Sequence, residues 1–307
     1  MNPEKVRSGR PGILILTALI AAAFSFGCGV KEGTDTGALA GEGSSARSGR
    51  EAAFEWFYDS FDDTRRAAYD AFRTAAEDPF DPEPVLIENS GGSPVKIRAA
   101  DLDTVYQGFL YDHPEIFWLS GSYSYRVSGS EGGEELADAV SVIPIPESAQ
   151  ELNRQIREFE EAAQEILDSS AELKEDEERA RALYDSLSKN TEYVEEALYD
   201  SALRKEHTAY GAVAEKRAVC DGIALAYKYL LDRCGIRCIL IPGMSEGASH
   251  VWNTVFWDGA WHESDPTWDT ASGENNSGQY FDLTTEEMNK DHRREEDGIA
   301  LMIPEAQ

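Results

Sequence analysis

The sequence is poor in cysteine and in basic residues. Four of its 307 residues are cysteine, and one of these, Cys28, belongs to the N-terminal segment described below. The remaining Cys220, Cys234 and Cys238 are odd in number, which argues against a full disulfide framework. Lys and Arg total 28 against 58 Asp and Glu, for a formal net charge of -30. Because such a charge repels phosphate backbones, we expect no nucleic-acid partner and a preference for neutral or cationic substrates.

The chain also lacks a comfortable membrane span in its N-terminal apolar run, Gly12–Phe26, which is too short. This run follows a basic start and is followed by Gly27 and Cys28, a pattern that resembles a bacterial lipoprotein signal. We therefore predict that residues 1–27 are an export signal. Cleavage would leave Cys28 as a lipid-bearing N-terminus on the extracytoplasmic side, with the lipid as the only contact with the membrane. Plain secretion with cleavage near Gly27 is the alternative.

The rest of the chain divides into three predicted regions. Residues 28–50 are rich in Gly, Ser and Thr, which predicts a flexible tether spanning roughly 25 Å. Residues 51–146 combine helical spacing with an alternating strand pattern, which predicts a small α+β region. Residues 147–307 form the third region. It begins with two runs of apolar residues at helical spacing and contains the candidate catalytic residues described below. Hydrophobic residues at 41% and aromatic residues at 10% exclude a disordered chain.

The elements predicted within residues 51–146 are two helices and a hairpin. The helical patterns cover residues 51–76 and about 101–111, and the strands lie near residues 123–127 and 137–145. Several aromatic residues of this region could contact a substrate or a partner, although a place in the core is the simpler interpretation: Phe117, Trp118, Tyr123 and Tyr125.

Cys220 lies at the start of a predicted helix. The apolar residues from 219 to 234 recur at helical spacing, and Gly235 ends the pattern. The positive end of the helix dipole is expected to lower the pKa of the Cys220 thiol. Because no capping residue precedes the helix, the N–H of Cys220 is a candidate donor to an oxyanion. Cys234 and Cys238 fall at a helix end and a strand start, where we expect small buried apolar side chains rather than a bridge.

A hairpin downstream of this helix brings a histidine and an aspartate to one face. Asp258-Gly259 is a strong two-residue turn signal between two strand patterns. With this turn, His250, Trp252 and Asp265 share a face, and His250 is the diagonal neighbour of Asp265 at about 7–8 Å or less. Cys220, His250 and Asp265 are therefore predicted to be a thiol nucleophile, its base and the carboxylate that orients the base.

The other histidines are weaker candidates. His262 points to the opposite face of the hairpin from His250, so we interpret it as a surface or packing residue. A metal site built from His250, His262 and Asp265 is disfavoured for the same reason, and no metal or other cofactor is predicted. His207 and His292 have no supporting pattern, and His113, which precedes a proline at a helix end, is interpreted as structural.

Several motifs together resemble the core of the transglutaminase-like superfamily. They are Ala218-Val219-Cys220-Asp221-Gly222, Gly235-Ile236-Arg237-Cys238, His250-Val251-Trp252-Asn253, Asp258-Gly259-Ala260-Trp261 and Asp265-Pro266-Thr267-Trp268-Asp269. A segment containing Tyr280-Phe281-Asp282-Leu283-Thr284 and Asp291-His292 is similar to the closing part of bacterial members. The resemblance covers about residues 178–295. It implies a papain-like α+β fold in which Cys220, His250 and Asp265 act as a catalytic triad.

The expected function is acyl transfer from an amide bond in a peptide or protein, including cell-wall peptide. Hydrolysis by a secreted peptidase or amidase, in which water accepts the acyl group, is favoured. The alternative is cross-linking by transamidation, in which an amine accepts the acyl group. The alternative to an enzyme is a catalytically silent binding module at the cell surface. We expect Tyr210, Gly222 and Trp252 to lie along the substrate groove.

Overall fold

The computed structural model describes residues 5–7, 54–271 and 278–307, all of which lie in one compact unit. The predicted tether at residues 28–50 and the predicted lipidation site Cys28 lie outside the described residues, as does the predicted signal apart from residues 5–7. The domain boundary predicted after residue 146 stays a prediction. No helix in the described part of the chain is both long and apolar enough to cross a membrane.

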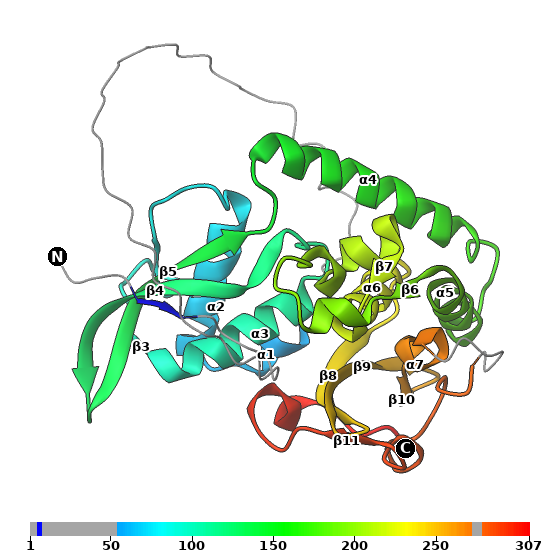
Figure 1. Ribbon diagram of the computed structural model, residues 1–307. Helices are drawn as coiled ribbons and strands as arrows, with labels where there is room; N and C mark the ends of the chain where they lie inside the picture. Colours follow the sequence, from blue (N-terminus) through cyan, green and yellow to red (C-terminus); the bar gives the residue numbers. More distant parts are fainter. Residues whose placement is uncertain (1–4, 8–53, 272–277) are drawn as a thin grey trace. The chain divides into compact units, whose positions relative to one another are not determined.

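Helices pack on a sheet in the N-terminal part of this unit, as predicted (Figure 1). The helical pattern at residues 51–76 predicts a single helix, but the structure has two. The side chain of Asp62 accepts hydrogen bonds from the backbone N–H groups of Thr64 and Arg65 and so starts a second helix. The helices of this part are α1 (Trp56–Ser60), α2 (Asp63–Glu77), η1 (Ala99–Asp101) and α3 (Leu102–Asp112).

The sheet of this part is antiparallel and has the order β1-β4-β5-β2, with β3 also beside β5. Its central hairpin is the predicted one, and the strands are longer than the sequence pattern indicates. Tyr123 and Tyr125 on β4 and Phe117 before it are buried, so these aromatic residues belong to the core, as the simpler interpretation holds. The strands are β1 (Lys5–Arg7), β2 (Val85–Leu86), β3 (Ile97–Arg98), β4 (Leu119–Glu131) and β5 (Glu134–Pro144).

The C-terminal part is built around one buried helix, α6, packed between α5 and an antiparallel sheet of the order β10-β9-β8-β11 (Figure 1). The α+β class predicted from the sequence is therefore confirmed. The helices are α4 (Ala149–Asp168), α5 (Asp176–Asn190), η2 (Glu195–Leu198), η3 (Lys205–His207), η4 (Gly211–Glu215), α6 (Cys220–Arg233), α7 (Pro266–Ala271), α8 (Thr285–Met288) and η5 (Gly298–Met302). The strands are β6 (Glu192–Tyr193), β7 (Arg217–Ala218), β8 (Cys238–Ser245), β9 (Ala248–Trp257), β10 (Ala260–Ser264) and β11 (His292–Arg294).

The sequence of α6 explains its central place. Its predicted apolar stripe is buried, and Gly235 at φ 75° closes the helix as expected. Small residues at other positions, among them Gly222 and Ala224, let the neighbouring chain approach closely, so that burial extends beyond the stripe. Cys238 is buried and Cys234 partly so, and both are free thiols. The N-terminus of this buried helix is thus held in a fixed place by packing on several sides.

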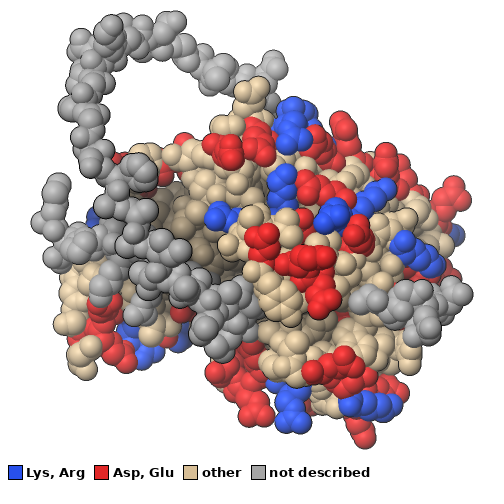
Figure 2. Space-filling view, in the orientation of Figure 1, with Lys and Arg blue, Asp and Glu red and all other residues tan. Residues whose placement is uncertain are grey.

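Acidic side chains are spread over the face of the molecule shown in Figure 2, with basic side chains between them. Surface pairs such as Arg154 with Glu158 join some of them. Exposed pairs of this kind contribute little to stability, typically about 0–1 kcal/mol each. The surface charge therefore bears on solubility and on the approach of charged molecules rather than on the fold.

A lysine is buried in the middle of α6. Lys228 is 1% exposed, and its Nζ donates to Oδ2 of Asp232 at 2.8 Å, to the carbonyl of Cys238 at 3.0 Å and to the carbonyl of Phe54 at 3.3 Å. Burial raises the pKa of Asp232 to about 7, and the charge of Lys228 limits the rise. The ammonium group therefore joins α6, β8 and the chain before α1 through three polar contacts inside the protein.

Replacing Lys228 by methionine is expected to destabilise the protein by about 3–5 kcal/mol, because the Asp232 carboxylate would remain buried without its partner. Urea unfolding followed by circular dichroism measures this change. The double variant Lys228→Met with Asp232→Leu should recover much of the loss, since neither charge of the pair then remains buried. An unfolding free energy equal to that of the wild type in the single variant would contradict this account.

Candidate active site

Cys220 is the first residue of α6 and lies against β9. The preceding Val219 is extended, and its side chain makes no capping hydrogen bond, as the sequence predicts. The thiol is buried, with 4% of the residue exposed, and the backbone N–H groups of Val251 and Asp221 donate to the sulfur. Val251 directly follows His250, so the packing of α6 on β9 brings the sulfur next to the segment that carries the histidine.

The expectation that the helix dipole lowers the pKa of Cys220 is wrong. Burial raises the pKa of this thiol above its ordinary value, and the negative charges of Asp221 and Asp265 raise it further. The hydrogen bonds from Val251 and Asp221 lower it but do not outweigh burial. A thiol whose pKa is raised in this way requires a base to take its proton when the sulfur attacks.

The predicted hairpin that carries the histidine and the aspartate is confirmed. Asp258 and Gly259 form its two-residue loop with φ values of 51° and 83°, as a type I′ turn requires. Trp257 pairs with Ala260, which is the register expected from the sequence. Because the register sets which side chains share a face, Asp265 at the end of β10 faces the same way as the histidine on β9.

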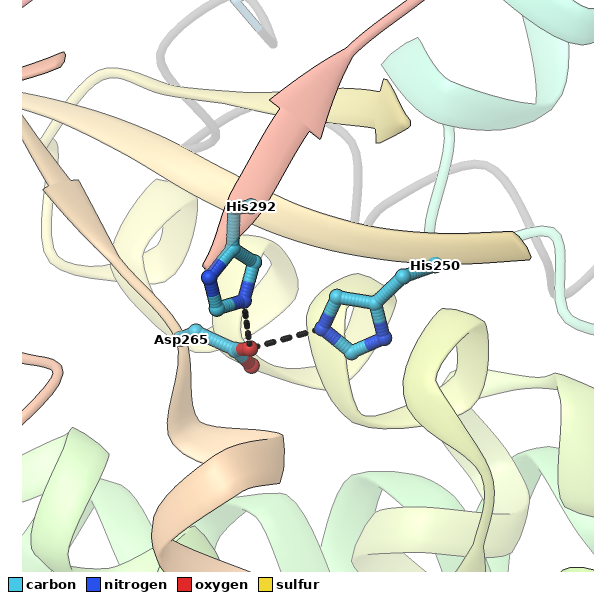
Figure 3. Close-up of side chains that lie close together, drawn as sticks. All are labelled: His250, Asp265 and His292. Carbon is cyan, nitrogen blue, oxygen red and sulfur yellow. Dashed lines mark hydrogen bonds and ion pairs between the residues drawn. The ribbon is translucent and has the colours of Figure 1, made fainter. Parts of the chain in front are cut away.

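His250 and Asp265 are in direct contact. Nε2 of His250 lies 2.7 Å from Oδ2 of Asp265, and the backbone N–H of Thr267 donates to Oδ1 at 2.9 Å. The other ring nitrogen of His250 points away from the carboxylate (Figure 3). Burial alone would raise the pKa of Asp265, but His250 and His292 hold it below its usual range. The aspartate is therefore ionised and can fix the orientation of the imidazole ring.

His292, for which the sequence shows no supporting pattern, completes the cluster. It is the first residue of β11, and its pairing with Ser245 on β8 places it beside Asp265. Its Nε2 lies 3.1 Å from Oδ2 of Asp265 (Figure 3). Its Nδ1 lies 2.6 Å from Oδ1 of Asp291. Burial would lower the pKa of His292, but the hydrogen bonds and charges of the two aspartates outweigh burial and raise it.

Aromatic rings surround this cluster. Trp252, Trp268 and Tyr280 each lie within 5.6 Å of the His292 ring, measured between ring centroids. The ring of Trp252 also stacks on His250, with an angle of 17° between the two planes. These rings limit the access of water to the polar groups, which strengthens the electrostatic interactions among them.

The prediction that Tyr210, Gly222 and Trp252 line the substrate groove stays a prediction. Tyr210 is 3% exposed and packs on Phe117, and Trp252 is fully buried. A side chain at Gly222 would meet the backbone carbonyls of Glu206 and Thr208. The space at Gly222 is therefore filled by the protein's own backbone.

His262 lies away from the cluster, as predicted. Its ring stacks on Trp257 with centroids 4.1 Å apart, and Nδ1 lies 2.6 Å from Oδ1 of Asp282. It is therefore a packing residue on the opposite face of the hairpin.

A second unexpected histidine, His207, contacts Asp221, the residue that follows the candidate nucleophile. Its Nδ1 is 2.8 Å from Oδ2 of Asp221, and its Nε2 is 3.0 Å from the carbonyl of Ala197. The charge of Asp221 is the main cause that raises the pKa of His207 to about 9. His207 is thus a cation at neutral pH and counters the carboxylate that follows Cys220.

The His207–Asp221 pair predicts that folding stability falls as the pH rises from about 6.5 to 9.5. The pKa of His207 is about 9 in the folded protein against an ordinary value of 6.5. The pair therefore contributes fully below about pH 6.5, and its contribution, up to about 3 kcal/mol, is lost as the pH passes 9. Urea unfolding at both pH values measures the slope. The slope should flatten in His207→Gln and persist in the control His262→Gln, and an unchanged slope in His207→Gln would refute the assignment.

Tyrosines from two other elements lie near Asp221, the residue that follows Cys220. Burial raises the pKa of Tyr111 on α3, and the nearby charges of Asp221 and Glu295 add to the rise. Burial likewise raises the pKa of Tyr193 on β6, and the charges of Asp221 and Asp265 add to the rise. Sequence reasoning missed both, because neither lies near Cys220 in the chain. The region before residue 146 therefore supplies part of the surroundings of the candidate nucleophile.

Comparison with known proteins finds sequences that are similar to this part of the chain. A sequence profile of the Transglutaminase-like superfamily matches residues 161–266, a span that contains Cys220, His250 and Asp265 but not His292. Kyphoscoliosis peptidase of Mus musculus is 29% identical over 118 residues, and that of Homo sapiens is 28% identical over 118 residues. Each alignment covers 34% of this chain and only 17% of the relative's length.

Among solved structures, a crystal structure of a TGase aligns with a TM-score of 0.36 and 15% identity, covering 51% of this chain and 47% of the other. The helix that carries the cysteine packs on the antiparallel sheet that carries the histidine and leads to the aspartate, which is the arrangement expected from the sequence. Residues 161–266 of this chain are thus similar in sequence to the transglutaminase-like superfamily.

Proposed function

We propose that this chain is a cysteine-dependent enzyme that transfers acyl groups from amide bonds of peptides or proteins, with Cys220 as nucleophile, His250 as base and Asp265 as the residue that orients the base. The observation that supports it most is the buried His250–Asp265 pair, with 2.7 Å between Nε2 and Oδ2, next to the thiol at the N-terminus of α6. A carboxylate, an imidazole and a thiol in this order are the parts of a nucleophilic triad.

The proposed reaction has two steps. The Cys220 sulfur attacks the amide carbonyl carbon while Nδ1 of His250 takes the thiol proton, and the N–H of Cys220 stabilises the resulting oxyanion. His250 then gives the proton to the leaving amine, and a thioester remains on the sulfur. In the second step His250 takes a proton from the acceptor, which is water in the favoured hydrolysis and a primary amine in transamidation, and the thiol is restored.

The experiment uses the full chain with mixed peptide and isopeptide substrates, including cell-wall peptides, in the presence and absence of a primary amine. Mass spectrometry should find the acyl group bound to Cys220 and a product acid. A product joined to the added amine in preference to the acid would establish transamidation. If no amide is cleaved and no adduct forms, the enzyme proposal fails. The burial of Cys220, with 4% exposed, would then favour a silent binding module at the cell surface.

We also propose that the protein is exported and held at the extracytoplasmic side of a membrane by a lipid on Cys28. The support is the sequence pattern of residues 1–28. Mass spectrometry of the mature N-terminus tests it, because a lipid-bearing cysteine and a plain cleaved end differ in mass. An N-terminus at Met1 would contradict export by this route.

A further inference from the structure

Two imidazole nitrogens and one carboxylate oxygen converge at the centre of the site. Nε2 of His250 and Nε2 of His292 lie 2.7 Å and 3.1 Å from Oδ2 of Asp265. Ligand atoms of the three residues all lie within 4.8 Å of one another, and the three residues are buried. They come from β9, the end of β10 and β11, so the fold itself brings them together (Figure 3). Two histidines and one carboxylate form a common donor set for zinc with an open fourth position.

The distances suit a small metal ion. Zinc with bonds of about 2.0–2.2 Å in a tetrahedron separates neighbouring ligand atoms by about 3.3–3.6 Å. The two observed separations from Oδ2, 2.7 Å and 3.1 Å, are shorter than this range. Small shifts of the rings would therefore admit the ion. Each ring now donates an N–H to Oδ2, and the ion would take the place of these two protons.

The groups that hydrogen-bond the three ligand residues also suit a metal site. Oδ1 of Asp291 accepts from Nδ1 of His292 at 2.6 Å, and the hydroxyl of Tyr280 donates to Oδ2 of Asp291 at 2.8 Å. A carboxylate behind a histidine fixes the tautomer that leaves Nε2 as the ligand atom and makes that nitrogen a stronger donor. The backbone N–H of Thr267 holds the second oxygen of Asp265 at 2.9 Å. The ligands are therefore already oriented.

We propose that His250, Asp265 and His292 form an inhibitory site for a divalent transition metal, with Zn²⁺ as the ion that fits best. The ion binds Nε2 of both rings and Oδ2 of Asp265, and water fills the fourth position. It separates His250 from Asp265 and leaves the ring proton of His250 on Nδ1, which then cannot take the thiol proton, so metal binding and amide turnover exclude each other. The inhibition rests on the proposed function, whereas the binding does not. Cys220 is not a ligand.

Calorimetry with Zn²⁺ on the full chain tests the binding. We expect one ion per chain, the same affinity in Cys220→Ala, and an affinity weaker by about 100-fold or more in His292→Gln. His262→Gln is the matched control, because it removes a histidine from a different His–Asp pair, and it should bind as the wild type does. Circular dichroism verifies that each variant is folded.

X-ray absorption of the Zn²⁺-loaded wild type identifies the ligand atoms directly and does not depend on the folding of a variant. It should show nitrogen and oxygen neighbours at about 2.0–2.2 Å and no sulfur at about 2.3 Å. A sulfur neighbour, or equal affinity in His292→Gln and His262→Gln, or no binding at one equivalent, would overturn the site. If an amide substrate is found, Zn²⁺ should inhibit its turnover at the concentration that fills the site, and a chelator should restore it. Binding without any turnover would reject the proposed function and retain the site.

Discussion

Replacing Cys220 by alanine is expected to lower amide turnover by about 10⁴-fold or more, to the background rate, while the protein stays folded. The thiol is the atom that forms the bond to the acyl group, and no other group can take its place once the nucleophile is lost. Alanine suits the first turn of a helix, so α6 should form as before. Initial rates with an amide substrate and a circular dichroism spectrum measure the two effects.

Cys234→Ala is the matched control for this experiment. Cys234 is also a free cysteine at an end of α6, but it is partly exposed at the C-terminal end of the helix. Its replacement should leave the rate of amide turnover unchanged. Substantial turnover in the Cys220→Ala variant would place the nucleophile elsewhere and remove the basis of the proposed mechanism.

Replacing Asp265 by asparagine is expected to lower kcat by about 10³–10⁴-fold, since the amide cannot stabilise an imidazolium and can favour the wrong tautomer of the ring. The buried carboxylate now faces Nε2 of both His250 and His292. An amide of the same shape keeps the packing while it removes the charge. Steady-state kinetics should show the loss in kcat rather than in KM.

Asp282→Asn is the control for this substitution. It removes the carboxylate that contacts His262, with 2.6 Å between Nδ1 and Oδ1, in a pair that lies away from Cys220. An aspartate with φ 61° tolerates asparagine, which also adopts this conformation. Its kcat should equal that of the wild type. If Asp265→Asn retains full activity, the aspartate has no role in orienting the base.

The parts of the site that the sequence predicts are those fixed by local geometry. Asp258-Gly259 allows a two-residue turn, and this turn alone determines that His250 and Asp265 share a face. The start of α6 follows similarly from its apolar spacing and from the lack of a capping side chain before Cys220. These inferences need no knowledge of distant contacts, and the structure agrees with them.

The parts that the sequence does not predict depend on contacts between distant segments. His292 enters the cluster only because the three-residue strand β11 pairs with β8. The raised pKa of Cys220 arises from burial and from the charges of Asp221 and of Asp265, which lies far from it in the chain. Lys228 falls outside the apolar stripe predicted for α6, yet it can be buried because Asp232 and two carbonyls accept hydrogen bonds from its ammonium group. A local sequence pattern does not predict these contacts between distant segments.

The short strand β11 has a consequence for how the protein avoids association with its own copies. It covers the outer edge of β8, an eight-residue strand of mostly buried residues, by pairing with residues 243–245. A chain that ended before His292 would expose the backbone N–H and C=O groups of that edge, and exposed edges of apolar strands template aggregation. The segment that supplies His292 to the cluster therefore also keeps the sheet from extending into a neighbouring molecule.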